Sequence, residues 1–237
     1  MRDDLFNNDS DIADFRFDDT VVAVFDDMVR RSVPGYEAMI QMVGLLVRTY
    51  GQDNTNFYDL GASTGAITLA LALNNKSKNN KFIAVDNSQE MVKQCKENLT
   101  SKIDNLAVIC SDINDINIEN ASIVVLNLTL QFIEVEKRSA LINRIYQGLN
   151  QGGILIVSEK IHFDIQQKQN IITKLHMDYK RANGYSELEI SKKRQSLENI
   201  MITESKDTHL ERFKTSGFKD SNCYFQCLNF VSFLSVK

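Results

Sequence analysis

The run from Phe57 to Gly65, with the sequence FYDLGASTG, constrains the fold more than any other part of this chain. Its aromatic start predicts a strand that ends in a glycine-containing turn, and an apolar helix over residues 66–73 follows at once. A second apolar strand, over residues 82–85, is closed by Asp86 about twenty-five residues beyond Gly61, where a carboxylate can accept the hydroxyl protons of a ribose. The spacing predicts a βαβ unit that binds a nucleoside.

The glycine turn departs from the dinucleotide pattern GxGxxG, because Ser63 replaces the middle glycine and Gly65 follows two residues later. A pyrophosphate requires glycines and a helix N-terminus aimed at it. S-adenosylmethionine has no phosphate and needs backbone groups that bind its amino-acid end. The glycine turn of this chain, which begins at Asp59, suits S-adenosylmethionine better than a pyrophosphate. The alternative is a strand-to-helix turn that merely packs tightly, and Asp86 argues against it.

Composition favours a single α/β domain over residues 1–237. The apolar fraction of 43% is ample for one large core, and acidic and basic residues are interspersed with a net charge of -4. Direct binding of nucleic acid is therefore disfavoured. No run approaches the ~20 apolar residues of a membrane span, and the acidic start MRDD lacks the apolar region of a secretion signal. We expect a cytoplasmic protein without a membrane segment.

The cysteines and histidines show no metal-ligand spacing. No CxxC occurs and the histidines are scattered, so we expect no metal, and reduced cysteines that serve as packing residues. The residues concerned are Cys95, Cys110, Cys223, Cys227, His162, His176 and His209.

Alternating strand and helix patterns predict a doubly wound, seven-stranded, Rossmann-like sheet. Helical spacing over residues 20–33 is interrupted by Pro34, and a second helix over residues 36–50 leads to the first strand. Further helices are expected at 66–73, 88–99 and 136–149, and strands are expected up to Leu60 and at 82–85, 106–110, 122–128, 154–157, near 223–225 and at 229–236, with a tight turn at 150–153. The alternation implies a parallel sheet.

Two segments fall outside this alternation. Residues 1–17 are polar and aspartate-rich, which predicts a mobile arm or lid. Residues 164–217 carry nearly unbroken helix signals and are too long for one crossover. We expect them to form a helical insertion, or lid, over the carboxyl edge of the sheet, where open α/β sheets bind ligands. Tyr36, at a helix start, can overhang the glycine turn, and an ordinary packing role is the alternative.

Two polar residues follow the third and fourth strands. Asp112 can accept the exocyclic amine of adenine while the backbone N–H of Ile113 meets a ring nitrogen, but an aspartate here can equally cap a helix or turn. Asn127 is expected in the crevice near the sulfonium or the amino-acid end, and a structural amide network explains it about as well. The chain lacks both the [DN]PP[FY] motif of many amino methyltransferases and the Pro-Cys nucleophile of cytosine C5 enzymes.

Several sequence blocks resemble the carboxy-S-adenosyl-L-methionine synthase family of the class I S-adenosylmethionine-dependent methyltransferase superfamily. They run in order over nearly the whole chain, and RANGYSELEI in particular has no generic structural meaning. The blocks are SVPGY at 32–36, VVLNLTLQF at 124–132, YQGLN at 146–150, RANGYSELEI at 181–190 and KR at 193–194.

The resemblance implies which residues contact the adenosyl ligand. Ala62 stands where the family more often has cysteine, but the backbone makes that contact. The implied set is Tyr36, Gly61, Ala62, Ser63, Asp86, Asn87, Asp112, Ile113, Asn127 and Arg194.

The resemblance also implies the reaction. S-adenosylmethionine and prephenate become carboxy-S-adenosylmethionine and phenylpyruvate: prephenate releases carboxylate and hydroxide, hydroxide removes a methyl proton, and the sulfonium ylide captures carbon dioxide. This chemistry requires a closed, water-poor pocket and no protein general base. The product serves a separate enzyme that converts the wobble uridine of transfer RNA to 5-oxyacetyluridine, so this chain need not touch RNA.

The resemblance implies a specific role for Arg194 in binding the product. Its guanidinium is expected to bind the new carboxylate bidentately, from the partner subunit of a homodimer, whereas the alternative is a solvated helix charge. The candidates for holding prephenate are Arg194, Tyr185, Arg181 and Lys160. Two other functions stay open: a conventional methyltransferase of a small molecule or tRNA, and a non-catalytic regulatory subunit that binds an adenosyl ligand.

Overall fold

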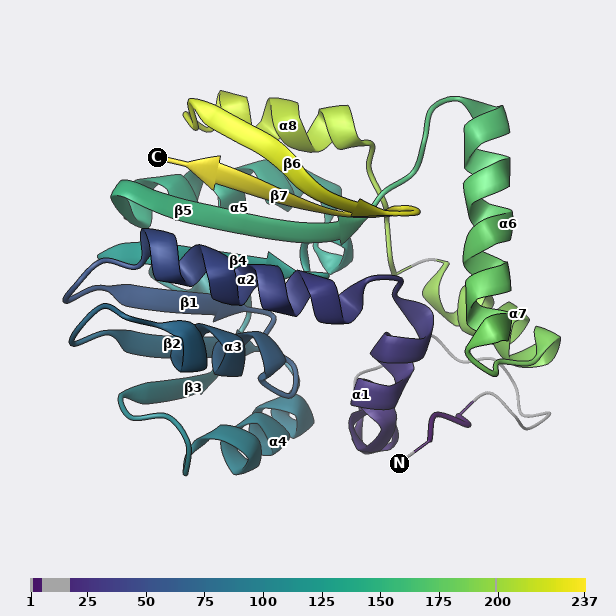
Figure 1. The fold of residues 1–237 in the computed structure, drawn as a ribbon, viewed down its shortest axis with the longest axis horizontal. Coiled ribbons are helices and arrows are strands. Elements are labelled where there is room, and N and C mark those ends of the chain that lie inside the picture. Colours follow the sequence, from purple (N-terminus) through teal and green to yellow (C-terminus); the bar gives the residue numbers. More distant parts are fainter. Residues whose placement is uncertain (1, 6–17, 199) are drawn as a thin grey trace.

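The centre of the molecule is a seven-stranded sheet flanked by helices (Figure 1). This computed structural model describes residues 2–5, 18–198 and 200–237. The strands are β1 (Asn56–Leu60), β2 (Lys81–Asp86), β3 (Leu106–Cys110), β4 (Ala121–Asn127), β5 (Leu149–Lys160), β6 (Asp220–Cys227) and β7 (Phe230–Val236). Their order across the sheet is β3-β2-β1-β4-β5-β7-β6. The predicted doubly wound α/β fold is confirmed.

The end of the sheet departs from the expected parallel pattern. Strands β1 to β5 pair in parallel, whereas β7 runs antiparallel to both β5 and β6. The physical reason is the short connection between β6 and β7, which consists only of Leu228 and Asn229. A connection this short can join only antiparallel neighbours.

Strand β5 begins earlier than the sequence suggests. Ala121 of β4 pairs with Leu149, but Ile123 pairs with Ile154, so the intervening residues 150–153 form a bulge within the strand. The predicted tight turn is therefore part of β5 and not a connection that precedes it. A bulge of this kind keeps the strand paired while it bends the backbone locally.

Each face of the sheet is covered by its own set of helices. Helices α2 (Tyr36–Tyr50), α3 (Ala66–Asn74) and α4 (Gln89–Leu99) cover one face, and α5 (Val135–Gly148) and α8 (Lys206–Thr215) cover the other (Figure 1). Successive residues of β4 alternate between the two cores: Ile123 contributes to the first and Val124 to the second. This period of two is the geometry of a strand buried on both sides.

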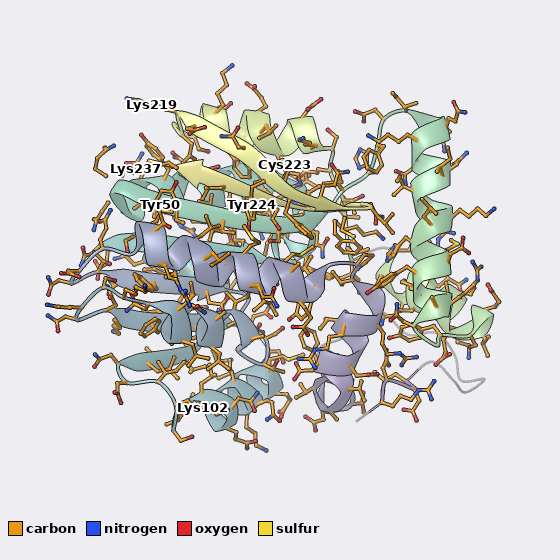
Figure 2. The ribbon with its side chains drawn as sticks, viewed as in Figure 1. Tyr50, Lys102, Lys219, Cys223, Tyr224 and Lys237 are labelled. Atoms are coloured by element: carbon orange, nitrogen blue, oxygen red, sulfur yellow. The ribbon has the colours of Figure 1, made fainter. Side chains whose placement is uncertain are left out.

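Three helices stand beyond the carboxyl ends of the parallel strands: α1 (Asp19–Ser32), α6 (Gln166–Ala182) and α7 (Glu187–Leu197) (Figure 1). Figure 2 shows Tyr50 and Lys237 at the opposite end of the molecule. The segment 164–217 thus divides into two parts. Helices α6 and α7 occupy the carboxyl edge, whereas α8 packs against α5 and β6.

The first residues of the chain dock onto this helical end. Asp3 is only 1% exposed, and its backbone N–H donates to Asp27 of α1 at 2.7 Å. The hydroxyl of Tyr185 and the ammonium of Lys193, at 3.3 Å, both donate to the Asp3 carboxylate. Residues 6–17 of the predicted mobile arm lie outside the described residues.

Candidate functional site

A cavity of about 430 Å³ opens at the carboxyl ends of the parallel strands, between the sheet and α1, α6 and α7. Its size is typical of small-molecule sites, and its place is where open α/β sheets bind ligands. Every residue of the predicted adenosyl-binding set except Arg194 lines it, namely Tyr36, Gly61, Ala62, Ser63, Asp86, Asn87, Asp112, Ile113 and Asn127. The fold therefore brings together residues from five separate segments of the chain.

The glycine turn is shaped by close packing. Gly61 has a φ of +83°, and a Cβ at this position would lie 2.3 Å from Oγ1 of Thr129. Only glycine fits there without displacing the loop after β4. Asp59, which precedes the turn, accepts the backbone N–H of Thr68 at 2.9 Å and its hydroxyl at 2.6 Å. Asp59 does not line the cavity, so its described role is to join β1 to α3 behind the turn.

Asp86 connects the glycine turn to the start of α4. Its Oδ2 accepts the N–H of Ser63 at 2.9 Å, and its Oδ1 accepts the N–H of Ser88 at 2.9 Å. Burial raises the pKa of Asp86, and these backbone hydrogen bonds oppose the rise. A hydrogen bond from the backbone N–H of Asn87 also opposes the rise. A carboxylate offers about four acceptor positions, so the group can still accept a hydroxyl from the cavity side.

Asp112 caps a turn and also lines the cavity. Its carboxylate accepts the N–H of Asn114 at 2.8 Å and caps the short 3-10 helix Ile113–Asp115, and the same residue lines the cavity. Arg144 fixes this turn from behind, because its guanidinium donates to the carbonyl of Ile113 at 2.8 Å. The buried side chain of Ile113 adds an apolar surface beside the carboxylate.

Tyr36 lies at the first position of α2, directly after Gly35, which has a φ of +80°. The ring is buried and lines the cavity, as predicted. Burial and the carboxylates of Asp26 and Asp59 raise the pKa of Tyr36, so the phenol keeps its proton. In the described part of the chain its hydroxyl has no hydrogen-bond partner, which leaves it available as a donor to a ligand.

The loop after β4 is organised by a buried carboxylate that sequence reasoning missed. Glu159 of β5 is fully buried and accepts the N–H groups of Thr129, Leu130 and Gln131 at 3.2, 2.7 and 3.0 Å. Burial raises its pKa to about 8, opposed by these hydrogen bonds. An acidic residue inside the apolar run ILIVSEK is a signal that could have found it.

Asn127, at the end of β4, presents an open hydrogen-bonding atom. Its Oδ1 is buried and has no partner within residues 2–5, 18–198 and 200–237. An unpaired buried polar atom is unfavourable unless something bonds to it. Because Asn127 also lines the cavity, a ligand group is the natural partner.

The cavity has two electrostatic ends. Asp86 and Asp112 lie at the ends of β2 and β3, whereas Lys160 ends β5, Lys180 lies on α6 and Lys193 lies on α7. Burial lowers the pKa of Lys160 to about 8, and burial together with the charges of Lys193 and Lys160 lowers the pKa of Lys180 to about 7. Burial and mutual repulsion thus disfavour the charged forms of these lysines, and an anionic group bound at the lysine end would favour them.

Two further residues belong to the lysine end. His176 of α6 donates from Nε2 to the carbonyl of Ser32 at 2.8 Å, and burial, followed by the charge of Lys180, lowers its pKa to about 3. Lys193 is paired with Asp3, and its pKa is lowered to about 8 mainly by burial. Sequence reasoning did not connect Lys180, Lys193 or His176 with the site.

The predicted carboxylate-binding candidates are placed differently from one another. Lys160 lines the cavity. Arg181 is exposed and pairs with Glu187 and Asp178, and buried Tyr185 bonds to Asp3. Neither residue is among those that line the cavity. Arg194 is exposed on α7, next to Lys193, and its charge contributes to the lowered pKa of Lys160.

Within the described ranges no cluster of three or more histidine, cysteine or acidic side chains could hold a metal ion. Across those ranges, too, no helix is long and apolar enough to cross a membrane. The four cysteines all fall in the described part and are free, and Figure 2 shows Cys223 on β6.

Comparisons with known proteins agree with this geometry. A methyltransferase-domain family matches residues 57–153. The carboxy-S-adenosyl-L-methionine synthase of Ruthia magnifica subsp. Calyptogena magnifica is 64% identical over 237 residues, covering 100% of both chains. That of Shewanella oneidensis is 50% identical over 228 residues, covering 95% of this chain and 94% of the relative.

Solved structures share the fold at low sequence identity. A putative O-methyltransferase from Nostoc punctiforme has a TM-score of 0.64 and 16% identity, over 92% of this chain and 59% of that one. Human N-acetylserotonin methyltransferase in complex with S-adenosylmethionine has a TM-score of 0.59 and 16% identity, over 92% of this chain and 55% of that one.

Proposed function

The chain belongs to the carboxy-S-adenosyl-L-methionine synthase family, and we propose that its cavity binds S-adenosylmethionine and prephenate together and converts them to carboxy-S-adenosylmethionine and phenylpyruvate. The observation that carries this proposal is the convergence of nearly all the implied adenosyl-binding residues on one cavity. Family membership alone would leave the place of the reaction open. The cavity provides that place.

The residues suggest one orientation of the adenosyl ligand. The carboxylate of Asp86 binds the ribose hydroxyls, and Asp112 with the backbone of Ile113 binds adenine. The turn at Gly61–Ser63 then faces the amino-acid end, and the open Oδ1 of Asn127 lies toward the middle of the ligand. This order places the sulfonium near the boundary between the acidic and basic ends of the cavity.

The reaction needs little acid or base from the protein. Prephenate loses its ring carboxylate as carbon dioxide and its hydroxyl as hydroxide, and the ring becomes aromatic. Hydroxide takes one proton from the sulfonium methyl group to form water, and the resulting ylide carbon bonds to carbon dioxide. The protein's task is to exclude bulk water and hold the reactants in contact, which α1, α6 and α7 perform around the cavity.

We assign Arg194 to the new carboxylate across a homodimer. In the single chain Arg194 is exposed and is not among the residues that line the cavity, although its charge acts on Lys160. We infer that in the homodimer it extends over the cavity of the partner subunit. Ile171, Leu175 and Leu188, on the outer faces of α6 and α7, are 52%, 45% and 43% exposed. Ile171 and Leu175 are one helical turn apart on α6, and exposed apolar side chains at such spacing are typical of an association surface.

The product is handed to a separate enzyme that modifies the wobble uridine of transfer RNA. This chain has a net charge of -4, which disfavours direct contact with RNA. Its partners at the cavity are thus small molecules, and its protein partner is a second copy of itself.

The test is the identity of the product. The purified protein is incubated with S-adenosylmethionine and prephenate, and the adenosyl compounds are analysed by mass spectrometry. We expect a product heavier than S-adenosylmethionine by one carboxyl group, together with phenylpyruvate in equal amount. Transfer of an unmodified methyl group to a small molecule or tRNA, without that product, would support a conventional methyltransferase. Binding of the adenosyl ligand without any turnover would support a regulatory subunit.

A further inference from the structure

The basic end of the cavity holds more positive charge than its protein partners neutralise. Lys160, Lys180 and Lys193 all line it, and they come from β5, α6 and α7. Among the described residues only Lys193 has a carboxylate partner, Asp3 at 3.3 Å, and it also donates to Ser32 at 2.9 Å. The ammonium groups of Lys160 and Lys180 have no hydrogen bond or ion pair there.

Two unpaired ammonium groups on one cavity wall repel each other. Both side chains line the same cavity, and the charge of Lys160 contributes to the lowered pKa of Lys180. Such an arrangement is unfavourable in the empty protein and becomes favourable when anionic groups enter. The acidic residues that line the cavity do not fill this role, because Asp86 and Asp112 lie at the other end and Glu134 pairs with Lys137 at 2.9 Å.

The positive charge of S-adenosylmethionine indicates that the basic end of the cavity binds a second, anionic ligand. S-adenosylmethionine carries a sulfonium, an ammonium and one carboxylate, for a net charge of about +1. In the proposed pose its carboxylate lies at the Gly61–Ser63 turn, so a lysine cluster beside the sulfonium would repel the ligand. An anionic co-substrate between the two would remove this repulsion. Prephenate carries two carboxylates, which matches the number of unpaired lysines.

We propose that the ammonium groups of Lys160 and Lys180 bind the two carboxylates of prephenate, while Asp3 holds Lys193 beside them. This assignment rests on the proposed function. His176 adds no charge near neutral pH, because burial and the charge of Lys180 lower its pKa to about 3. The substrate therefore meets two cations held on separate elements, a strand and a helix.

The space behind Lys160 supports this assignment. A smaller cavity of about 170 Å³ shares Lys160 and His176 with the large one. It is also lined by Asn229, whose buried Oδ1 has no partner among the described residues. The basic end therefore continues past Lys160 into a polar space.

The experiment separates prephenate binding from catalysis. Wild type, Lys160→Met and Lys180→Met are saturated with S-adenosylhomocysteine, which has no methyl group to react, and titrated calorimetrically with prephenate. We expect each substitution to weaken prephenate binding roughly ten- to hundredfold, because a charge-assisted hydrogen bond is lost. The KM for prephenate should rise similarly, whereas affinity for S-adenosylmethionine should be unchanged or higher. Lys180→Arg, which keeps the charge, should recover most of the binding.

Lys174→Met is the matched control, because Lys174 lies on the same helix, is exposed and is not among the residues that line the cavity. If either Met variant fails to melt cooperatively, Lys160→Gln and Lys180→Gln provide a second pair. Unchanged prephenate affinity in folded variants of both lysines would overturn the assignment. That result differs from failure of the proposed function, in which wild type itself neither binds prephenate nor makes the carboxylated product.

Discussion

The carboxylate of Asp86 holds the glycine turn in place, because its Oδ2 accepts the backbone N–H of Ser63 at 2.9 Å. The residue proposed to bind the ribose is therefore also the residue that fixes the turn facing the amino-acid end. Changes at Asp86 should affect both ends of the adenosyl ligand at once.

Asp86→Ala should weaken binding of S-adenosylmethionine by about 2 kcal/mol, since charge-assisted hydrogen bonds to the ribose are lost. Isothermal titration of wild type and variant measures the difference. Asp104→Ala, at an exposed position that does not line the cavity, is the control and should bind normally. An Asp86→Ala protein that binds as tightly as wild type would contradict the ribose assignment.

Tyr36→Phe should lower adenosyl-ligand affinity while the melting temperature stays near that of wild type. The hydroxyl has no partner in the described residues, so its removal takes nothing from the folded state, but a ligand would lose a donor. Calorimetric titration and thermal melting of the same samples distinguish the two effects. A large fall in melting temperature would instead make Tyr36 a structural residue.

Arg194→Ala should change ligand selectivity. Loss of its guanidinium should weaken carboxy-S-adenosylmethionine by roughly 2 to 5 kcal/mol, whereas S-adenosylmethionine should bind equally or slightly more tightly. The ratio of the two dissociation constants is the measured quantity, and Lys102→Ala serves as a control with an unchanged ratio. Equal weakening of both ligands would show that Arg194 does not bind the carboxylate.

Leu175→Glu should convert the proposed homodimer to a monomer, because it places a charge in the exposed apolar group on α6 and α7. Light scattering coupled to size-exclusion chromatography gives the mass. Leu73→Glu changes an even more exposed leucine, at 72%, on α3 and should leave the mass unchanged. A wild-type protein that is already monomeric would contradict both the proposed homodimer and the proposal that Arg194 acts in the cavity of the partner subunit.

Acid should destabilise the protein partly through His209, which is 2% exposed. Burial, and then the charge of Arg212, lowers its pKa from the ordinary 6.5 to about 4. Between these values the unfolded chain binds more protons, so stability is complete above pH 6.5 and falls as the pH drops toward 4. The contribution is on the order of 3 kcal/mol at most.

Urea unfolding of wild type and His209→Phe across this pH range tests the prediction. The variant has no proton to bind at this position, and its aromatic ring can pack beside Phe213 and Phe233 as the imidazole does. Its stability should therefore depend less steeply on pH. Parallel pH profiles for the two proteins would show that His209 titrates alike in the folded and unfolded chains.

The part of the cavity proposed to hold the adenosyl ligand could be predicted from sequence, because the residues that line it follow strand ends that are visible locally. The positions of Gly61, Asp86, Asp112 and Asn127 follow from where strands end, and parallel strands bring those ends to one edge. The basic half could not be predicted this way. Lys180 and Lys193 face the cavity only because of how α6 and α7 pack. The sequence of a charged helix has the same pattern whether a given lysine faces solvent or a ligand.

Two buried carboxylates, Glu159 and Asp3, also depend on contacts with distant segments that a local sequence pattern does not reveal. Glu159 was detectable as an acidic residue in an apolar strand, but its partners are backbone N–H groups of another loop, which no side-chain pattern reveals. Asp3 lies in a segment whose average composition indicates disorder. The hydrogen bonds of Asp3 with Tyr185 and Lys193 hold it in place, although the composition of the surrounding segment indicates disorder.

The docking of Asp3 also has a consequence for the order in which the protein is made. Asp3 emerges from the ribosome among the first residues, yet Lys193, its partner, follows 190 positions later. During synthesis the βαβ unit around Asp86 can form while Asp3 still has no counter-ion to bind. The wall beside the proposed prephenate site is thus completed only when Lys193 has been synthesised, late in translation. A growing chain would therefore form the nucleoside-binding side of the pocket, around Asp86, before it forms the side proposed to bind prephenate.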